Sequence, residues 1–298
     1  MRYILHILFF SLLTPLSNIW AEEGEIWQVA EQKFISEKVL LARLALSKNI
    51  IIGIRPDNPE HHRGTARLIE KLTKAGQKPV ILVTSIERSK QNAFAIFRQR
   101  HHEIGKEYDA TGLDMLLNWS QSGQPDWVIT RPLFDMAMLK KIPIKAVNFS
   151  RYEIGQLHLN GLDGLPEDLK VTLQPLLARR TKGQATSRTK EKIRKEYCDT
   201  LPPEVLAKFV VIRQARESLF ALAMTATGPK TAVLIMPQNY VEKDTGVPRI
   251  LKDIGDAGET ISLSFVETGQ NIRDRNVDFI WVTAKIPRPR PCQTHLTN

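Results

Sequence analysis

A strand, a helix and a second strand follow one another early in the sequence. "NIIIGI" (49–54) is a short, largely apolar run, which is typical of a strand buried on both faces. A helix is expected from about His61 to Ala75, and Gly76 ends it. "PVILVT" (79–84) is a second run of the same kind. This order predicts a βαβ unit, and therefore parallel strands.

Later segments extend the pattern. Residues 26–47 place apolar side chains near helical period and predict one amphipathic helix. Further buried strands are expected at 144–149 and 231–236. The segment 151–228 between them holds no strand signal and predicts a helical insertion. Near the end, "ISLSFV" and "VDFIWVT" predict two strands with no helix between them, which favours an antiparallel pair.

The expected fold class is therefore α/β: a mostly parallel central sheet flanked by helices, with a helical insertion at about 151–228 and an antiparallel C-terminal strand pair. In such sheets the ligand crevice lies at the carboxyl ends of the strands. That rule gathers four segments around one crevice: 54–62, 84–88, 148–151 and 236–245.

The N-terminus has the features of a secretory signal peptide. Arg2 is followed by an apolar stretch and then by small or polar residues that end at Ala21. We expect cleavage after Ala21 and export to a periplasmic or secreted location, with an uncleaved membrane anchor as the alternative. The predicted organisation is a signal peptide (1–21), one α/β domain (22–286) and a Pro-rich basic tail (287–298).

The net charge and the two cysteines limit which partners and which disulfide can be expected. The net charge is +10, which in an exported protein favours an acidic ligand or an anionic membrane surface over nucleic acid. The basic stretch 178–196 is more typical of a solvated loop and helix start than of a binding patch. An exported compartment permits a disulfide between Cys198 and Cys292, and the sequence leaves this pairing open.

The stretch "GIRPDNPEHHR" (53–63) lies at the predicted crevice. Asn58 can cap a helix that begins at Pro59. The adjacent His61 and His62 point about 100° apart on a helix, and the i, i+4 spacing of a two-His zinc site is absent. A helix start with polar side chains is therefore favoured over a metal site.

Five blocks of the sequence resemble the haem-binding uptake proteins of the ChaN type, in the Tiki/ChaN superfamily. The blocks appear in the family's order across about residues 40–283: "NIIIGIRPDNPEHHRGTARLIEKL", "PVILVTSIERSKQNAF", "NWSQSGQPDWVITRPLFDMAM" with "KIPIKAVNFSR", "EYCDTLPPE" and "TAVLIMPQNYVEKDTGVPRIL". The resemblance implies a ChaN-like fold.

The chain departs from the family at several crevice positions. The family's Glu and His of the first block fall at Ile54 and Pro56, and the Glu that ends its second strand falls at Thr84. Its His residues in the last two blocks fall at Tyr197 and Tyr240. The polar residues that persist are Asp57, Asn58, His61, His62, Asn148 and Arg151.

The resemblance implies an exported haem- or porphyrin-binding protein in iron or haem uptake, and a possible homodimer. Ferric haem accepts Tyr or His as an axial ligand. Tyr197 and Tyr240 are the candidate iron ligands, and Arg151 is expected to favour a phenolate or to pair with a propionate. His61, His62, Asp57 and Asn148 are the other candidate haem contacts. If both tyrosines faced one open crevice, haem binding would be favoured.

Two alternatives remain open. One is a ChaN-like scaffold or interaction protein that has lost the ligand, since several polar crevice groups are missing. The other is a metal-dependent hydrolase of the wider superfamily, for which Asp57 and His62 could form an acid–base pair. Because both family Glu positions are apolar or neutral here, catalysis is the less favoured reading.

Overall fold

The computed structural model describes residues 21–102, 108–180, 184–256, 258–289 and 292. The predicted signal peptide, apart from Ala21, lies outside the described residues, as do parts of the tail. No helix within these ranges is long and apolar enough to span a bilayer. The division into signal peptide, domain and tail therefore stays a prediction.

The described strands form one eight-stranded sheet in the order β2-β1-β8-β7-β3-β6-β4-β5. The strands are β1 (Ile26–Gln28), β2 (Lys33–Ile35), β3 (Asn49–Ile54), β4 (Pro79–Glu87), β5 (Ile144–Asn148), β6 (Thr231–Pro237), β7 (Thr260–Glu267) and β8 (Phe279–Thr283). From β8 to β5 all neighbours are parallel. Every residue of β3 is buried, as expected for a strand covered on both faces.

The predicted α/β fold with a mostly parallel sheet is confirmed, but the predicted direction of its last two strands is wrong. β7 and β8 pair in parallel, with Leu263 opposite Phe279 and Glu267 opposite Thr283. The segment 268–278 connects these two parallel strands without a helix. The absence of a helix between them therefore did not indicate antiparallel pairing. The antiparallel pairs are those of β1 with β2 and with β8.

The single helix predicted for 26–47 is also wrong. The segment folds as β1, β2 and then α1 (Glu37–Leu46). Gln32 turns the chain between the strands with φ 47°, and Ser36 caps α1 by accepting a hydrogen bond from the Val39 amide. In the sequence, the apolar residues of the short β1–β2 hairpin and of α1 together have a spacing close to that of one helix.

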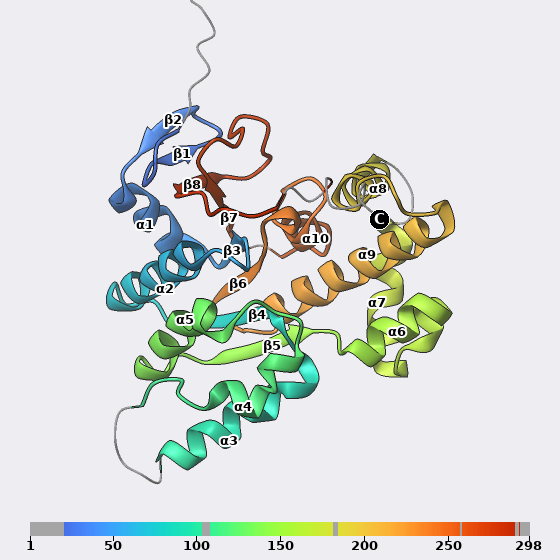
Figure 1. Cartoon of the computed structure of the whole chain (residues 1–298), viewed down its shortest axis with the longest axis horizontal. Helices are drawn as coiled ribbons and strands as arrows, with labels where there is room; N and C mark the ends of the chain where they lie inside the picture. Colours follow the sequence, from blue (N-terminus) through green and yellow to red (C-terminus); the bar gives the residue numbers. More distant parts are fainter. Residues whose placement is uncertain (1–20, 103–107, 181–183, 257, 290–291, 293–298) are drawn as a thin grey trace, which may run out of the picture.

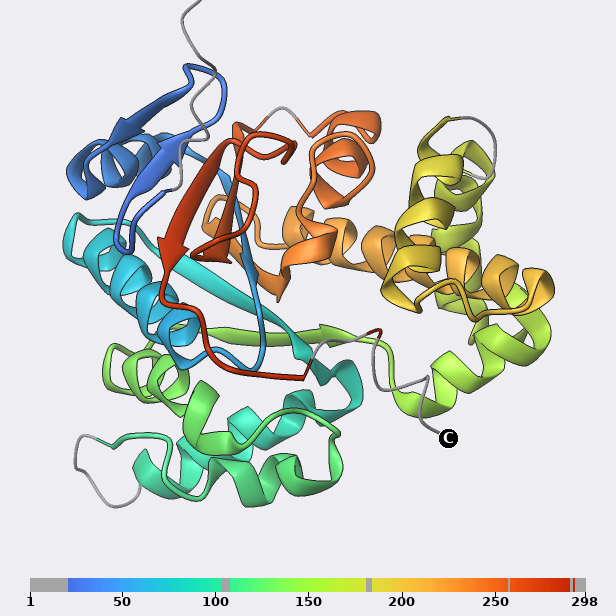
Figure 2. The same ribbon diagram turned by 45° about the horizontal axis from the view of Figure 1, so that its top comes forward.

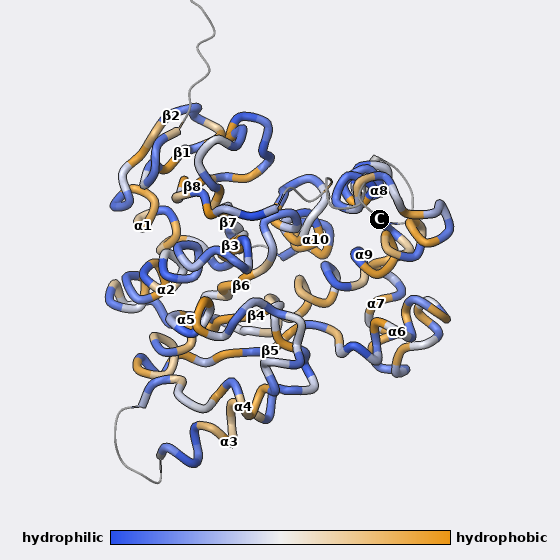
Figure 3. The backbone as a smooth tube through the Cα atoms, in the orientation of Figure 1, coloured by the Kyte–Doolittle hydropathy of each residue, from blue (hydrophilic) through white to orange (hydrophobic). Residues whose placement is uncertain are grey.

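Helices cover both faces of the sheet (Figures 1 and 2). One face packs against α1, α2 (Pro59–Lys74), α3 (Gln91–His102) and α5 (Trp127–Leu139), and the other against α9 (Pro203–Thr225) and α10 (Val247–Asp253). Figure 3 shows hydrophobic segments along the central strands, between these two layers. A short helix, α4 (Leu113–Leu117), follows α3.

The predicted helical insertion between β5 and β6 is present. It consists of α6 (Arg151–Asn160), α7 (Glu167–Arg180), α8 (Gln184–Glu196) and α9. α6, α7 and α9 share a small core of their own around Leu157, Leu173 and Ile212. Figure 1 shows these helices to one side of the sheet, so that α9 links the sheet layer to the insertion.

The basic stretch predicted as loop and helix start is largely helix α8. Several of its cations form internal ion pairs: Arg180 with Glu217 at 2.6 Å, Lys192 with Glu242 and Arg188 with Asp244. These pairs attach α7 and α8 to the neighbouring α9 and to the loop after β6. Three basic residues of this stretch therefore help to hold the insertion in place.

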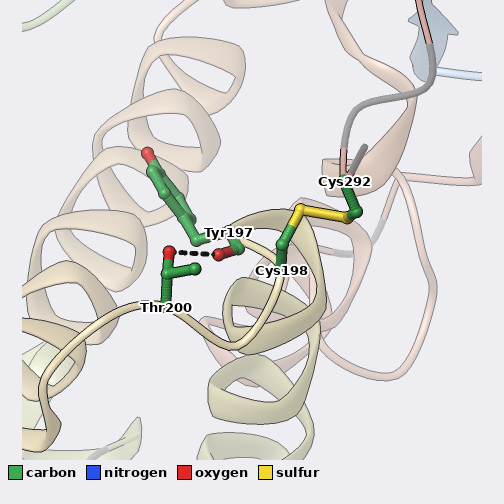
Figure 4. Close-up of a disulfide and its surroundings, with 4 residues drawn as sticks. All are labelled: Tyr197, Cys198, Thr200 and Cys292. Carbon is green, nitrogen blue, oxygen red and sulfur yellow. Dashed lines mark hydrogen bonds between the residues drawn. A yellow bond between two sulfur atoms is a disulfide. The ribbon is translucent and has the colours of Figure 1, made fainter. Parts of the chain in front are cut away.

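A disulfide joins Cys198, just after α8, to Cys292 in the tail. Figure 4 shows Tyr197 beside this disulfide with its ring turned away from the two sulfur atoms. The pairing that the sequence left open is thus formed. It ties the chain beyond β8 to the insertion.

Candidate functional site

Three adjoining hollows lie at or beside the carboxyl ends of the central strands. The first, here called the inner cavity, has a volume of about 210 Å³ and lies over the ends of β3, β4, β5 and β6. The second, the Tyr groove, has a volume of about 530 Å³ and is walled by α6, α8 and α9. The third, the α6 hollow, has a volume of about 510 Å³ and lies beside the start of α6. The crevice is therefore where the parallel-sheet rule placed it.

Arg216 on α9 lines all three hollows. Its side chain is half-buried, and its Nε is buried without a hydrogen-bond partner. No ion pair involving Arg216 is found among the described residues. A guanidinium with an unused donor at the junction of three hollows is well placed to meet an anionic group.

The Tyr groove brings together the two tyrosines predicted as iron ligands. Tyr197 follows α8, and Tyr240 belongs to a short 3-10 helix (Gln238–Tyr240) directly after β6. Both rings line the same groove. Neither phenol oxygen has a hydrogen-bond partner within the described part of the chain, where Tyr197 is exposed and Tyr240 is half-buried.

A guanidinium lies over the ring of Tyr240. The central carbon of Arg213 is 4.1 Å from the ring centroid, within the range of a cation–π interaction. Arg213 is itself held by carboxylates, with Nη1 2.9 Å from Glu196 and Nε 3.3 Å from Glu217. Because these bonds orient Arg213, Tyr240 has a fixed positive neighbour.

Tyr197 is in a different environment. Burial against its surroundings, together with Tyr240 and Glu196 nearby, raises the pKa of the Tyr197 hydroxyl, and Arg216 acts in the opposite direction. Its ring packs edge-on against Phe209 at 5.1 Å. The side chain is nevertheless 42% exposed. The surroundings of Tyr197 therefore disfavour its phenolate form.

Arg151 and Asn148 also reach this region. Arg151 lines the Tyr groove and the α6 hollow and donates from Nη2 to the carbonyl of Gln121. Asn148, at the end of β5, lines the inner cavity and the α6 hollow. Its Nδ2 donates to the Thr84 carbonyl at 2.8 Å, which leaves the buried Oδ1 without a partner.

His61 does not reach any of the three hollows. It is fully buried, accepts at Nδ1 from the Arg55 amide at 2.8 Å, and its Nε2 lies 2.9 Å from the Thr283 hydroxyl. Burial lowers the pKa of His61 to about 3, so the ring is neutral at pH 7. With both nitrogens engaged and the ring stacked on Phe265, His61 joins α2 to the sheet.

Asp57 likewise lies outside the lining of the hollows. Its carboxylate pairs with Arg288 of the tail at 2.8 Å. Arg288 also pairs with Glu267, which is 2% exposed and accepts from Asn58 at 2.8 Å. Burial alone would raise the pKa of Glu267, but the hydrogen bonds from Arg288 and Asn58 hold it below its usual value.

Asn58 performs the helix-capping role predicted for it. Its Oδ1 accepts from the Glu60 amide at 2.9 Å, and Pro59 begins α2. His62, the second of the adjacent pair, does line the inner cavity. Its Nε2 lies 2.9 Å from the Pro56 carbonyl, and its Nδ1 is buried without a partner.

Sequence reasoning missed Arg213 and Arg216, two of the most prominent groups at the site. Their signal was present: "IRQARESLF" places two arginines three residues apart in a stretch predicted to be helical. Charges on the inner face of a helix are costly unless they are paired or used. Within the described ranges, no group of three or more His, Cys, Asp or Glu side chains has metal-site geometry.

Comparisons with known proteins bear on the family. The family model described as "Haem-binding uptake, Tiki superfamily, ChaN" matches residues 40–251. A solved structure described as cofacial haem binding to ChaN of Campylobacter jejuni aligns with a TM-score of 0.69 at 17% identity, covering 86% of this chain and 95% of that chain. The type III effector HopBA1 aligns with a TM-score of 0.43 at 12% identity, covering 83% and 92%. A search of curated proteins finds no match.

Proposed function

This chain belongs to the ChaN family of haem-binding uptake proteins in the Tiki superfamily, and on that premise we propose that it binds haem, or a related porphyrin, in the Tyr groove. The observation that carries the proposal is the pair Tyr197 and Tyr240. Both line one open groove, and both hydroxyls lack a partner among the described residues.

The lining of the groove suits a porphyrin. Apolar side chains provide a surface for a flat hydrophobic ring, namely Ile154, Leu159, Ile193, Phe209 and Ile212. The volume of about 530 Å³ is within the usual range of ligand pockets. Arg151 and Arg216 lie along the same groove and suit the carboxylates of haem propionates.

Tyr240 is the better candidate for the iron ligand. A ferric iron binds the phenolate form of Tyr, so a positive neighbour favours ligation. Arg213 lies 4.1 Å from the Tyr240 ring, whereas burial raises the pKa of Tyr197. In this proposal Tyr240 ligates the iron, and Tyr197 packs against the porphyrin or serves as a second ligand.

The wider role proposed is that of an exported, non-catalytic protein of iron or haem uptake. The apolar N-terminal stretch supports export through a cleavable signal peptide, to a periplasmic or secreted location. The neutral residues Ile54 and Thr84 at positions where the family has Glu support the absence of catalysis. A homodimer and a contact with an anionic membrane surface remain part of the proposal.

A haemin titration followed by visible absorbance tests the proposal. We expect saturable binding with a ferric tyrosinate spectrum. Tyr240→Phe should remove the charge-transfer band and weaken binding at least tenfold, because it removes the iron–oxygen bond. Tyr197→Phe should have a smaller effect.

Tyr108→Phe is the matched control, since Tyr108 packs against Phe97 and His101 on another part of the molecule. It should leave the titration unchanged. Non-saturable haemin uptake, with the same curve for all three variants, would overturn the proposal and favour a ChaN-like scaffold that has lost its ligand.

A further inference from the structure

The inner cavity contains polar groups that the proposed haem site does not use. It lies between the ends of β3, β4 and β6 and the side of α9, and His62 lines it without lining the Tyr groove. At this place the register of β4 against β5 shifts between Val83 and Glu87. Such irregularities are frequent beside binding sites because they interrupt pairing and re-aim side chains.

Three buried polar atoms on residues that line this cavity have no partner among the residues that the structure describes: Nδ1 of His62, Oδ1 of Asn148 and Nε of Arg216. A buried polar atom without a hydrogen bond costs free energy. Three of them around one cavity indicate that a bound molecule completes their hydrogen bonds.

The chemical roles of the three atoms follow from their neighbours. His62 is 5% exposed, and burial lowers its pKa, so the ring is neutral. Its Nε2 donates to the Pro56 carbonyl, which leaves Nδ1 as an acceptor. Asn148 donates from Nδ2 to the Thr84 carbonyl, which leaves Oδ1 as an acceptor. Arg216 offers a donor.

Charge restricts the ligand further. Arg216 is the charged residue in the lining of the cavity, and no Asp or Glu accompanies it there. A cation would be repelled, and a neutral molecule would leave the guanidinium without a counter-charge. The volume of about 210 Å³ is below the range of drug-sized pockets, so the ligand is small.

We propose that the inner cavity is a second ligand site, which adjoins the Tyr groove and shares Arg216 and Tyr240 with it, and that it binds a small hydroxycarboxylic acid. Its hydroxyl groups donate to His62 Nδ1 and Asn148 Oδ1, and its carboxylate accepts from Arg216. The apolar walls formed by Ile54, Val83 and Phe220 enclose the short carbon chain.

Three probes of similar size separate the parts of this recognition: glycerate with hydroxyls and a carboxylate, propionate with the carboxylate alone, and glycerol with hydroxyls alone. Calorimetry and saturation-transfer NMR on the protein without haem measure their binding. We expect glycerate to bind at least tenfold more tightly than the other two, since each lost buried hydrogen bond is worth about tenfold. Equal affinities for glycerate and propionate, or no saturable glycerate binding, would overturn the proposal.

Variants locate the site. His62→Phe and Arg216→Met should each weaken glycerate binding about tenfold, while Arg63→Met, an exposed arginine elsewhere on α2, should leave it unchanged. If His62→Phe fails to fold, the ¹⁵N resonance of His62 Nδ1 in the unaltered protein is the alternative readout. It should move on addition of glycerate and stay in place with propionate, and a resonance that does not respond to glycerate contradicts the proposal.

His62→Phe distinguishes this site from the proposed haem site. Arg216 lines both hollows, so Arg216→Met should affect both ligands, whereas His62 lines the inner cavity and not the Tyr groove, so His62→Phe should leave the haemin titration intact. Glycerate binding without haemin binding would overturn the proposed function and leave this inference standing, and the reverse result would do the opposite.

Discussion

Two polar clusters lie at the same edge of the sheet and differ in how their groups are paired. The turn cluster consists of Asp57, Asn58, His61, Glu267 and Arg288, and its side chains bond to one another or to nearby backbone and hydroxyl groups. The groove cluster consists of Tyr197, Tyr240, Arg213 and Arg216. Within the described residues, the buried Nε of Arg216 and both phenol oxygens have no hydrogen-bond partner.

This difference separates polar residues that stabilise the fold from polar residues that are available to bind a ligand. A buried polar group whose bonds are all made inside the protein contributes to folding, and its removal leaves the partner unsatisfied. A group left unpaired contributes little to folding and is available to a ligand. The turn cluster looked functional in the sequence because it holds His, Asp and Asn together, yet its contacts are those of a structural joint.

The largest change in stability is expected on removal of the disulfide that connects the turn cluster to the groove cluster. The tail leaves the turn cluster at Arg288 and is joined by Cys292 to Cys198, next to Tyr197. Replacing both cysteines by serine should lower the free energy of unfolding by about 4 kcal/mol, because the bond closes a long loop in the unfolded chain. Denaturant unfolding measures this.

A haemin titration of the same double variant completes that test. If the disulfide holds Tyr197 at the groove, haemin affinity falls even under conditions where the variant is fully folded. Unchanged affinity in the folded variant would show that the groove does not depend on the tail.

The second effect concerns the turn cluster itself. Arg288→Met leaves the buried carboxylate of Glu267 without its cation, and breaking such a pair costs about 3 kcal/mol. Chemical denaturation of the oxidised protein measures the loss. Arg63→Met breaks an exposed pair with Glu60 and should cost less than about 1 kcal/mol. Equal losses would mean that the turn cluster is not a structural joint.

The third effect is a pH dependence of stability. The pKa of His61 is about 3 in the folded protein and about 6.5 when unfolded, so the unfolded state binds the proton first as pH falls. The contribution of neutral His61 to stability is fully present above about pH 6.5 and decreases as the pH falls below that value. Between pH 7 and pH 4.5, protonation of His61 in the unfolded state should lower the free energy of unfolding by about 2–3 kcal/mol.

Denaturation at the two pH values checks this prediction. His62, whose pKa is also lowered by burial, adds to the decrease in the same direction. His61→Gln should reduce the difference between the two pH values, whatever its effect at pH 7. A variant with the same difference as the unaltered protein would show that His61 is not the group that titrates.

The smallest effect is expected in the groove cluster. Tyr197→Phe and Tyr240→Phe remove hydroxyls without a partner, so each should change the free energy of unfolding by less than about 0.5 kcal/mol. Thermal unfolding of the protein without haem measures this. A loss above about 1 kcal/mol in either variant would show that the hydroxyl has a structural bond, and the contrast between the two clusters would fail.

The sequence by itself determined the order of the central strands along the chain, the helical insertion, the start of α2 at Asn58 and the family. These features depend on local patterns: apolar runs, a capping side chain and matching blocks of residues. Where a local pattern was ambiguous, as at 26–47, prediction failed, because pairing of β1 with β8 is a contact between the two ends of the chain.

Only the tertiary structure decided which polar groups are paired. Adjacent His61 and His62 have the same sequence context, but one is bonded at both nitrogens and the other has an unpaired Nδ1 at a cavity. Glu267 and Arg288 reach Asp57 and Asn58 from more than two hundred residues away. A hydrogen bond depends on the position of its partner in space, and for long-range partners the folded chain alone supplies that position.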